Sequence, residues 1–243
     1  MVQKIKLSIF ILVLALASGP LWAAAPRPLV IGRLACAGQD RRADGLRQLA
    51  WEAVKRTSLE LYPEARWLNL ASADPWDTPL VVWSCEQPAG ELPALARDRL
   101  RQFLQLGGML WIDLPEPDGT FAAVARQELE KLFPGQALKA LAPEHVIFKS
   151  FFLIPRPAGR RVGWRAQALT LSGRVAVLWT EGDVLGALSR DLLGGWLFSC
   201  EPGGESQREE SFRLAINILM YAVCLDYKDD RVHLPFILRR RKI

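Results

Sequence analysis

Three residues that could perform nucleophilic or acid–base chemistry lie beside apolar segments of the chain. Cys85 ends the run "PLVVWSC" and would be a nucleophile if a base were close to it. That base would have to be His145, in "LAPEHVIF", because the other histidine, His233, lies in the C-terminal tail. Asp113 ends "GMLWID" and could act as a general base or a hydrogen-bonding anchor. This set would suit a cysteine-dependent hydrolase or transferase.

The residues around these candidates argue against a catalytic assignment. A catalytic nucleophile on a sharp turn has small neighbours, whereas Trp83 and Pro88 supply bulk and a proline on either side of Cys85. Asp113 precedes "LPEPDG", where an aspartate is typical of a capped turn. We therefore assign no catalytic residue and keep Cys85, His145 and Asp113 as candidates only.

The four cysteines are scattered along the chain, and their spacing matches no metal motif. We expect no zinc, haem or other cofactor. If the chain is exported, an oxidising compartment would favour disulfides. Adjacent parallel strands lie about 4.8 Å apart, so Cys36 and Cys85 can pair if their strands are neighbours. Cys200 is a rival partner, and Cys224 is expected to be a buried free thiol.

Residues 1–25 have the pattern of a Sec-type signal peptide. Lys4 and Lys6 precede the apolar run "LSIFILVLALASGPLWAAAP", and small residues make a cut near Ala23 to Ala25 plausible. The alternative is an uncleaved N-terminal anchor, because residues 7–25 are almost long enough to span a bilayer. Both alternatives predict a periplasmic domain, either free or anchored in the inner membrane.

The excess positive charge lies at the two ends of the chain. Without the leader lysines and four tail cations, the formal net charge falls from +5 to −1. No basic face is evident for binding phosphates, so nucleic acid is not an expected partner. The tail, residues 229–243, joins "VHLPFIL" to those cations and could contact anionic lipid or a protein partner. The four tail cations are Arg239, Arg240, Arg241 and Lys242.

Strand-like and helix-like segments alternate in the first half of the chain. The runs "RPLVIGRLAC", "ARWLNL", "PLVVWSC" and "GMLWIDL" predict strands. Helical spacing of apolar residues in "DGLRQLAWEAVKRTS", "LPALARDRLRQFLQLGG" and residues 121–132 predicts helices between and after them. Gly107 or Gly108 is expected to end the second helix, because a phosphate cradle would need glycines before a helix. Parallel strands joined by helical crossovers explain this order.

The pattern changes after Gly135. The segments "HVIFKSFFLI", "RRVGWRAQALTLSGRVAVLWTEGD" and "GGWLFSCEPG" predict further strands, some of them antiparallel. A last helix is expected to begin at Ser206, with Glu209 completing a capping box. Asp183 and Asn217 lie in apolar contexts and are expected to satisfy nearby backbone groups. No repeat or linker divides residues 27–228, which predicts a single α/β domain.

Four segments of the chain resemble a known family. They are "VIGRLACAG", "LRQFLQLGGMLWID", "LFPGQALKALAPEHVIFKSFF" and "FRLAINILMYAV" with "DYKDDRVHLP". Together they resemble a bacterial family of exported domains of unknown function, grouped with the class I glutamine amidotransferase-like fold, over most of residues 28–236. The resemblance implies a three-layer, flavodoxin-like α/β sandwich with a mostly parallel sheet. Relatives are often encoded beside MoxR-type ATPases and von Willebrand factor A proteins, which implies an envelope-associated assembly.

The resemblance carries over no catalytic residue. The amidotransferase triad needs a late histidine followed shortly by an acid, and the chain has no such His-x-Glu after its core strands. The first functional hypothesis is thus a non-catalytic periplasmic binding or scaffolding domain with a protein partner in the cell envelope. The alternative is a cysteine-dependent hydrolase or transferase that uses Cys85 and His145.

Overall fold

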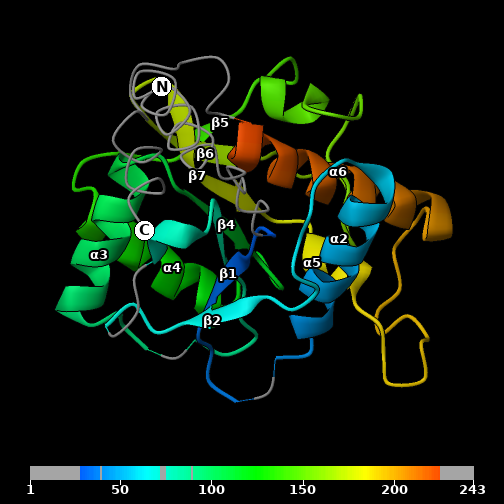
Figure 1. Ribbon diagram of the computed structural model, residues 1–243, viewed down its shortest axis with the longest axis horizontal. Coiled ribbons are helices and arrows are strands. Elements are labelled where there is room, and N and C mark those ends of the chain that lie inside the picture. Colours follow the sequence, from blue (N-terminus) through cyan, green and yellow to red (C-terminus); the bar gives the residue numbers. More distant parts are fainter. Residues whose placement is uncertain (1–27, 39, 72–74, 89, 225–243) are drawn as a thin grey trace, which may run out of the picture.

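A twisted sheet runs through the middle of the computed structural model (Figure 1). Within the described residues, 28–38, 40–71, 75–88 and 90–224, seven strands form one sheet in the order β2-β1-β3-β4-β7-β6-β5. The predicted leader (residues 1–25) and tail (residues 229–243) lie outside this part of the chain. In the part that is described, no helix has both the length and the apolar content to cross a bilayer.

The sheet is mostly parallel, as the sequence predicts. β1 pairs in parallel with β2 and β3, β3 with β4, and β4 with β7. The antiparallel pairs are β5 with β6 and β6 with β7, both in the C-terminal half. The strands are β1 (Ile31–Leu34), β2 (Arg66–Leu68), β3 (Leu80–Trp83), β4 (Met109–Asp113), β5 (Lys139–Ala140), β6 (Gln167–Leu171) and β7 (Arg174–Thr180).

Helices cover both faces of the sheet (Figure 1). α2, α5 and α6 pack on one face, and α3 and α4 pack on the other. The helices are α2 (Ala43–Arg56), α3 (Ala94–Gln105), α4 (Thr120–Leu132), α5 (Val184–Leu188) and α6 (Gly204–Cys224), with short 3-10 turns η1 (Pro75–Asp77) and η2 (Val146–Lys149).

The alternation of side chains along β4 explains how one apolar run serves both faces. Met109 and Trp111 point into the core under α2, α5 and α6, whereas Leu110 and Ile112 point into the core under α3 and α4. Successive side chains of a strand face opposite ways, so a central strand that is covered on both faces must be apolar throughout. All five residues of β4 are buried, including Asp113 at its end.

The predicted strand "HVIFKSFFLI" is wrong, because this segment forms η2 and a loop. Its backbone groups bond to the side chain of Asn217 on α6 instead of to a neighbouring strand. The Asn217 Oδ1 accepts hydrogen bonds from the N–H groups of Phe151 (3.1 Å) and Phe152 (2.7 Å), and its Nδ2 donates to the Phe152 carbonyl. Asn217 thus satisfies backbone groups as expected, and by doing so removes the need for a strand.

"GGWLFSCEPG" is also not a strand; it contributes only the isolated bridge between Arg190 and Trp196 within the described chain. The predicted capping box at Ser206 is wrong as well. α6 already begins at Gly204, and the Gly203 N–H donates to the Gln207 Oε1 at 2.9 Å. The first turn of α6 is polar and charged, so apolar spacing did not indicate that the helix starts this early.

The doubled glycine after α3 ends the helix as predicted. Gly107 has φ +115°, a backbone conformation that favours glycine. Gly108 has a different role: a Cβ there would lie 2.1 Å from the ring of Phe103. The pair therefore lets the chain turn and pass close to α3 on its way into β4.

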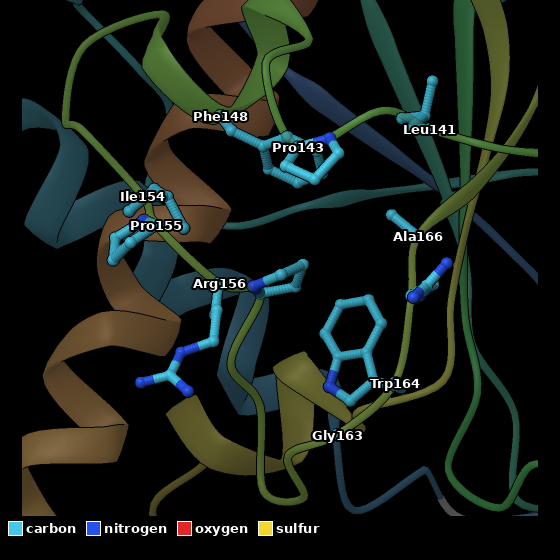
Figure 2. A pocket seen from close by; sticks show the side chains of 11 residues that line it. Leu141, Pro143, Phe148, Ile154, Pro155, Arg156, Gly163, Trp164 and Ala166 are labelled. Carbon is cyan, nitrogen blue, oxygen red and sulfur yellow. The ribbon is translucent and has the colours of Figure 1, made fainter.

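Residues 145–154, which form η2 and the loop after it, are called the η2 loop. A cavity opens between the η2 loop and the segment that leads into β6 (Figure 2). Its walls include Phe148 and Ile154 on one side and Trp164 and Ala166 on the other.

Candidate functional site

The carboxyl ends of β1, β3, β4 and β7 meet at one edge of the sheet, because these strands are mutually parallel. Ligands of open α/β sheets bind beyond this edge. The candidates Cys85 and Asp113 both lie there, at or directly after the ends of β3 and β4. This edge is therefore the first place to look for a functional site.

Cys85 is joined to Cys36 in a disulfide, with a Cα–Cα distance of 5.5 Å. The pairing follows from the sheet order, since β1 and β3 are neighbours and the two cysteines follow them. The Ala37 N–H also donates to the Gln87 carbonyl at 3.0 Å, so the segments after both strands are tied together. Cys85 is fully buried and has no thiol to offer as a nucleophile.

The remaining cysteines and His145 lie apart from this disulfide. Cys200 is a buried free thiol, and Cys224 is exposed, which corrects its prediction as a buried residue. The His145 ring packs against Tyr221 of α6, and its Nδ1 accepts from the Ile147 N–H at 3.2 Å. Burial, and then the charge of Lys149, lowers the pKa of His145. The structure does not bring His145 to Cys85, whose side chain packs on the α3 and α4 face.

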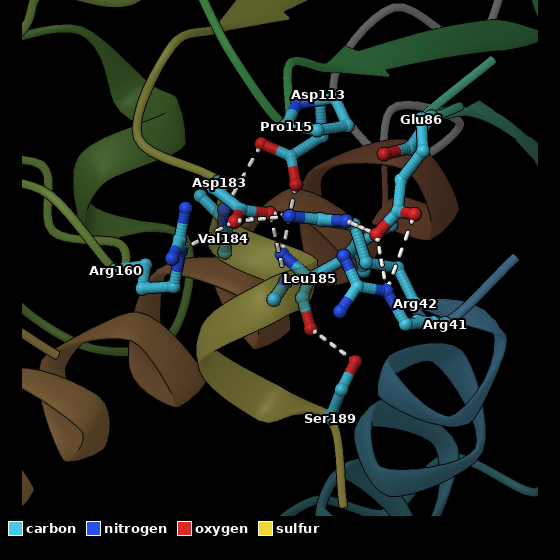
Figure 3. Close-up of polar contacts among 12 residues, drawn as sticks. Arg41, Arg42, Glu86, Asp113, Pro115, Arg160, Asp183, Val184, Leu185 and Ser189 are labelled. Carbon is cyan, nitrogen blue, oxygen red and sulfur yellow. Dashed lines mark hydrogen bonds and ion pairs between the residues drawn. The ribbon is translucent and has the colours of Figure 1, made fainter. Parts of the chain in front are cut away.

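Asp113 caps α5 from a neighbouring strand (Figure 3). Its carboxylate accepts hydrogen bonds from the N–H groups of Val184 (3.1 Å) and Leu185 (2.8 Å), and from the Thr180 hydroxyl (2.7 Å). The sequence predicts that Asp113 caps the turn at "LPEPDG". In the structure Asp113 instead caps the start of α5. Burial, aided by the nearby charge of Asp183, raises the pKa of Asp113 to about 6.

Asp183 is the centre of a buried ion-pair network (Figure 3). Its Oδ1 accepts from the Arg42 Nε at 2.6 Å, and its Oδ2 accepts from the Arg42 Nη2 at 2.7 Å and the Arg160 Nε at 2.6 Å. It also accepts from the Gly186 N–H at 3.1 Å, which is the backbone role that the sequence predicts. Its φ of +54° is held by these four contacts. The two arginines are partners that the sequence did not predict.

Glu86 extends the network to the surface. It pairs with the Arg42 Nη1 and, at 2.9 Å, with the Arg41 Nε. The ring of Phe198 lies beneath the guanidinium groups of Arg42 (4.6 Å to the ring centroid) and Arg160 (5.1 Å). Such stacking suits arginine because its flat, weakly hydrated cation can cover an aromatic face. We call Arg42, Glu86, Asp113, Arg160 and Asp183 the edge cluster.

The chemistry open to the edge cluster is limited. Asp113 and Asp183 are fully buried, and both accept several hydrogen bonds. Among the residues that the structure describes, no three histidine, cysteine or acidic side chains form a group that could hold a metal ion. The cluster therefore fixes the positions of α2, β4 and α5 relative to one another, and it presents no assembled nucleophile and base.

The raised pKa of Asp113 gives a testable pH dependence. A free aspartate titrates near pH 3.9, so the folded state holds the Asp113 proton more tightly than the unfolded state does. The contribution of Asp113 to the free energy of unfolding should therefore decrease as pH rises from about 4 to about 6. Asp113→Asn removes this pH-dependent contribution, because an asparagine side chain does not titrate. Relative to wild type, its free energy of unfolding should rise over that interval, by on the order of 2–3 kcal/mol.

Urea unfolding of both proteins at several pH values between 4 and 7 measures this difference. Asp98→Asn is the matched control, because Asp98 is an exposed aspartate on α3. Its curve should follow that of wild type closely. Parallel curves for wild type and Asp113→Asn would show that burial does not control the Asp113 proton.

A tight loop, residues 190–196, follows α5 and presents two leucines to solvent. The residues Leu192 and Leu193 have exposed fractions of 104% and 97%. The Asp191 carboxylate accepts from the N–H groups of Leu193 (2.9 Å) and Gly195 (2.8 Å), which closes the loop. At its base, the Arg190 N–H donates to Asp44 on α2 at 2.8 Å. We call residues 190–196 the leucine loop.

The fold and the edge define an α/β domain whose strand ends are held by a disulfide and a buried ion-pair network. The chain belongs to the family described as "Domain of unknown function (DUF4159)", whose model matches residues 30–223. This match confirms the resemblance to a family of domains of unknown function. A search of curated proteins found no match.

Proposed function

We propose that this chain is a non-catalytic periplasmic binding domain that docks on a protein partner in the cell envelope through the leucine loop. The observation that carries the proposal is the complete exposure of Leu192 and Leu193 on a loop that hydrogen bonds hold in shape. An ordered loop loses little conformational entropy when it binds, so its apolar side chains can contribute most of their burial energy. Leu192 and Leu193 are adjacent, and contiguous exposed apolar surface of this kind, unlike a single exposed side chain, marks interaction sites.

The periplasmic location is supported by the leader-like N-terminus and by the Cys36–Cys85 disulfide, since such bonds persist in oxidising compartments. For the fold, we propose the class I glutamine amidotransferase-like sandwich. The order β2-β1-β3-β4-β7 supports it, because it follows the flavodoxin-like arrangement with β7 in the fifth position. We do not propose cysteine-dependent catalysis, because the sulfur of Cys85 is bonded to Cys36.

A protein partner is favoured over a lipid bilayer on energetic grounds. Burying a leucine side chain contributes roughly 1.5–3 kcal/mol. Two leucines bury fewer carbons than a single myristoyl chain, which by itself gives only marginal membrane binding. In a fitted pocket of a protein, the same two side chains can act as anchors at the centre of an interface.

Site-specific photocrosslinking in the envelope of the native host tests the proposal. A photoreactive residue at Leu193 should capture a defined protein, and the double change Leu192→Asp plus Leu193→Asp should weaken binding of that purified protein about 100-fold. The free energy of unfolding should change by no more than about 0.5 kcal/mol, because both side chains are exposed.

Leu153 supplies the matched control. It is also a highly exposed leucine, on the η2 loop, and a photoreactive residue there should not capture the same protein. Equal capture from Leu153 and Leu193 would contradict the proposal. So would unchanged affinity of the double aspartate variant, or crosslinks from Leu193 to lipid alone.

A further inference from the structure

The cavity beside η2 has the size of a small-molecule site, and none of its lining residues belongs to the edge cluster or the leucine loop (Figure 2). Its volume is about 360 Å³, near the lower end of the range for ligand pockets. It lies between the η2 loop, which α6 holds through Asn217, and the segment that enters β6. The η2 wall is therefore anchored to α6, and the other wall continues into the sheet through β6.

The walls of the cavity offer little for hydrogen bonding. Three of the lining residues, Pro143, Pro155 and Pro157, have no backbone N–H to donate. The indole N–H of Trp164 is already donated to the Arg161 carbonyl at 3.0 Å. Phe148, Ile154 and Ala166 add apolar surface. The body of a ligand in this cavity would consequently be apolar.

Two cations at the rim stand out from the other arginines. Of the arginines within residues 28–38, 40–71, 75–88 and 90–224, only Arg156 and Arg165 make no hydrogen bond or ion pair to that part of the chain. Both line the cavity and both are exposed. By contrast, Arg160 and Arg161, which lie between them in sequence, both pair with Glu116. The two unpaired residues thus both line the same cavity.

We infer that the cavity binds a small anionic amphiphile, with its apolar body between the proline and tryptophan walls and its anionic head at Arg156 and Arg165. Figure 2 shows the guanidinium of Arg156 directed away from the apolar walls, so the head would be bound outside the cavity mouth. A carboxylate or a phosphate monoester satisfies this description, since arginine binds both through charge-assisted hydrogen bonds. This inference is independent of the proposed docking function.

Isothermal titration of the full chain with eight-carbon probes tests the ligand class. Octanoate and octyl phosphate should bind with one site per chain. Octan-1-ol should bind at least tenfold more weakly, and octylammonium should not bind measurably. Hexanoate should bind about 15-fold more weakly than octanoate, because each buried methylene changes affinity roughly fourfold.

The double change Arg156→Gln plus Arg165→Gln tests the head-group site. It should weaken octanoate binding at least tenfold and leave octan-1-ol binding unchanged, because only the charge is removed. Both side chains are exposed, so the variant should fold as wild type does. Lys55→Gln is the control, since Lys55 is an exposed cation on α2 and should not affect either ligand.

Two results would overturn the inference. Equal binding of octanoate and octylammonium would show that the rim charge does not select an anion. Unchanged octanoate affinity in the double glutamine variant would place any binding elsewhere on the protein. A difference between octanoate and octyl phosphate in either direction would instead identify the preferred head group while supporting the site.

Discussion

Replacing Arg42 with alanine is expected to lower the free energy of unfolding by about 3–5 kcal/mol, because it leaves Asp183 buried without its main partner. The Arg42 guanidinium donates two hydrogen bonds to Asp183, at 2.6 and 2.7 Å, and also pairs with Glu86. The side chains of Arg42 and Asp183 are 3% and 0% exposed, so in the folded protein this pair is shielded from bulk water. Urea unfolding of the purified domain at neutral pH measures the loss.

Arg41 provides a control at the next position in the chain. Its side chain is 57% exposed, pairs with Glu86 and lies 5.1 Å from the centroid of the Phe198 ring. Arg41→Ala should therefore cost no more than about 1 kcal/mol, as is usual for surface ion pairs. If both variants lost the same stability, the buried network would not hold α2 and α5 against the sheet edge.

Removing the disulfide is expected to have an effect of similar size. Cys36 and Cys85 are separated by 49 residues, and a crosslink that closes such a loop stabilises the folded state by about 4 kcal/mol, mainly by restricting the unfolded chain. The double change Cys36→Ala plus Cys85→Ala should lose this stabilisation. In urea unfolding, a reductant should lower the free energy of unfolding of wild type by the same amount. It should not lower that of the variant any further.

Cys224→Ser is the matched control for the disulfide, because Cys224 is an exposed free cysteine. This variant should keep the stability of wild type and its response to reductant. In the native, unreduced protein, iodoacetamide should label Cys224 and leave Cys36 and Cys85 unmodified. Labelling of Cys85 without reductant would contradict the disulfide and would restore the nucleophile hypothesis.

Much of the fold could be predicted because local patterns and sheet topology agree in the first half of the chain. Helical spacing gave α2, α3 and α4, and apolar runs gave the four parallel strands around them. Prediction from local patterns was wrong for the η2 segment. Its β-branched and aromatic residues are typical of a strand, but a side chain 65 residues away, Asn217, supplies the hydrogen bonds that a neighbouring strand would have supplied.

The edge cluster was harder to predict than the fold. Asp113 and Cys85 could be placed at the sheet edge because they follow apolar strands. Arg41 and Arg42 are identical neighbours in sequence, and nothing local distinguishes the exposed one from the buried one. The partner that makes this distinction, Asp183, lies 141 residues from Arg42. Such pairings are fixed by tertiary structure, and one sequence does not reveal them.

The placement of β7 next to β4 determines when the chain can finish folding. Asp113 of β4 and Thr180 of β7 meet although they are 67 positions apart in the sequence. Until β7 arrives, one side of β4 exposes unpaired N–H and C=O groups that can bond to another molecule. Parallel pairing over such a distance is intrinsically slow. An incomplete chain that ends before β7 is therefore prone to aggregate, and the yield of native protein depends on how quickly the final strands join the growing sheet.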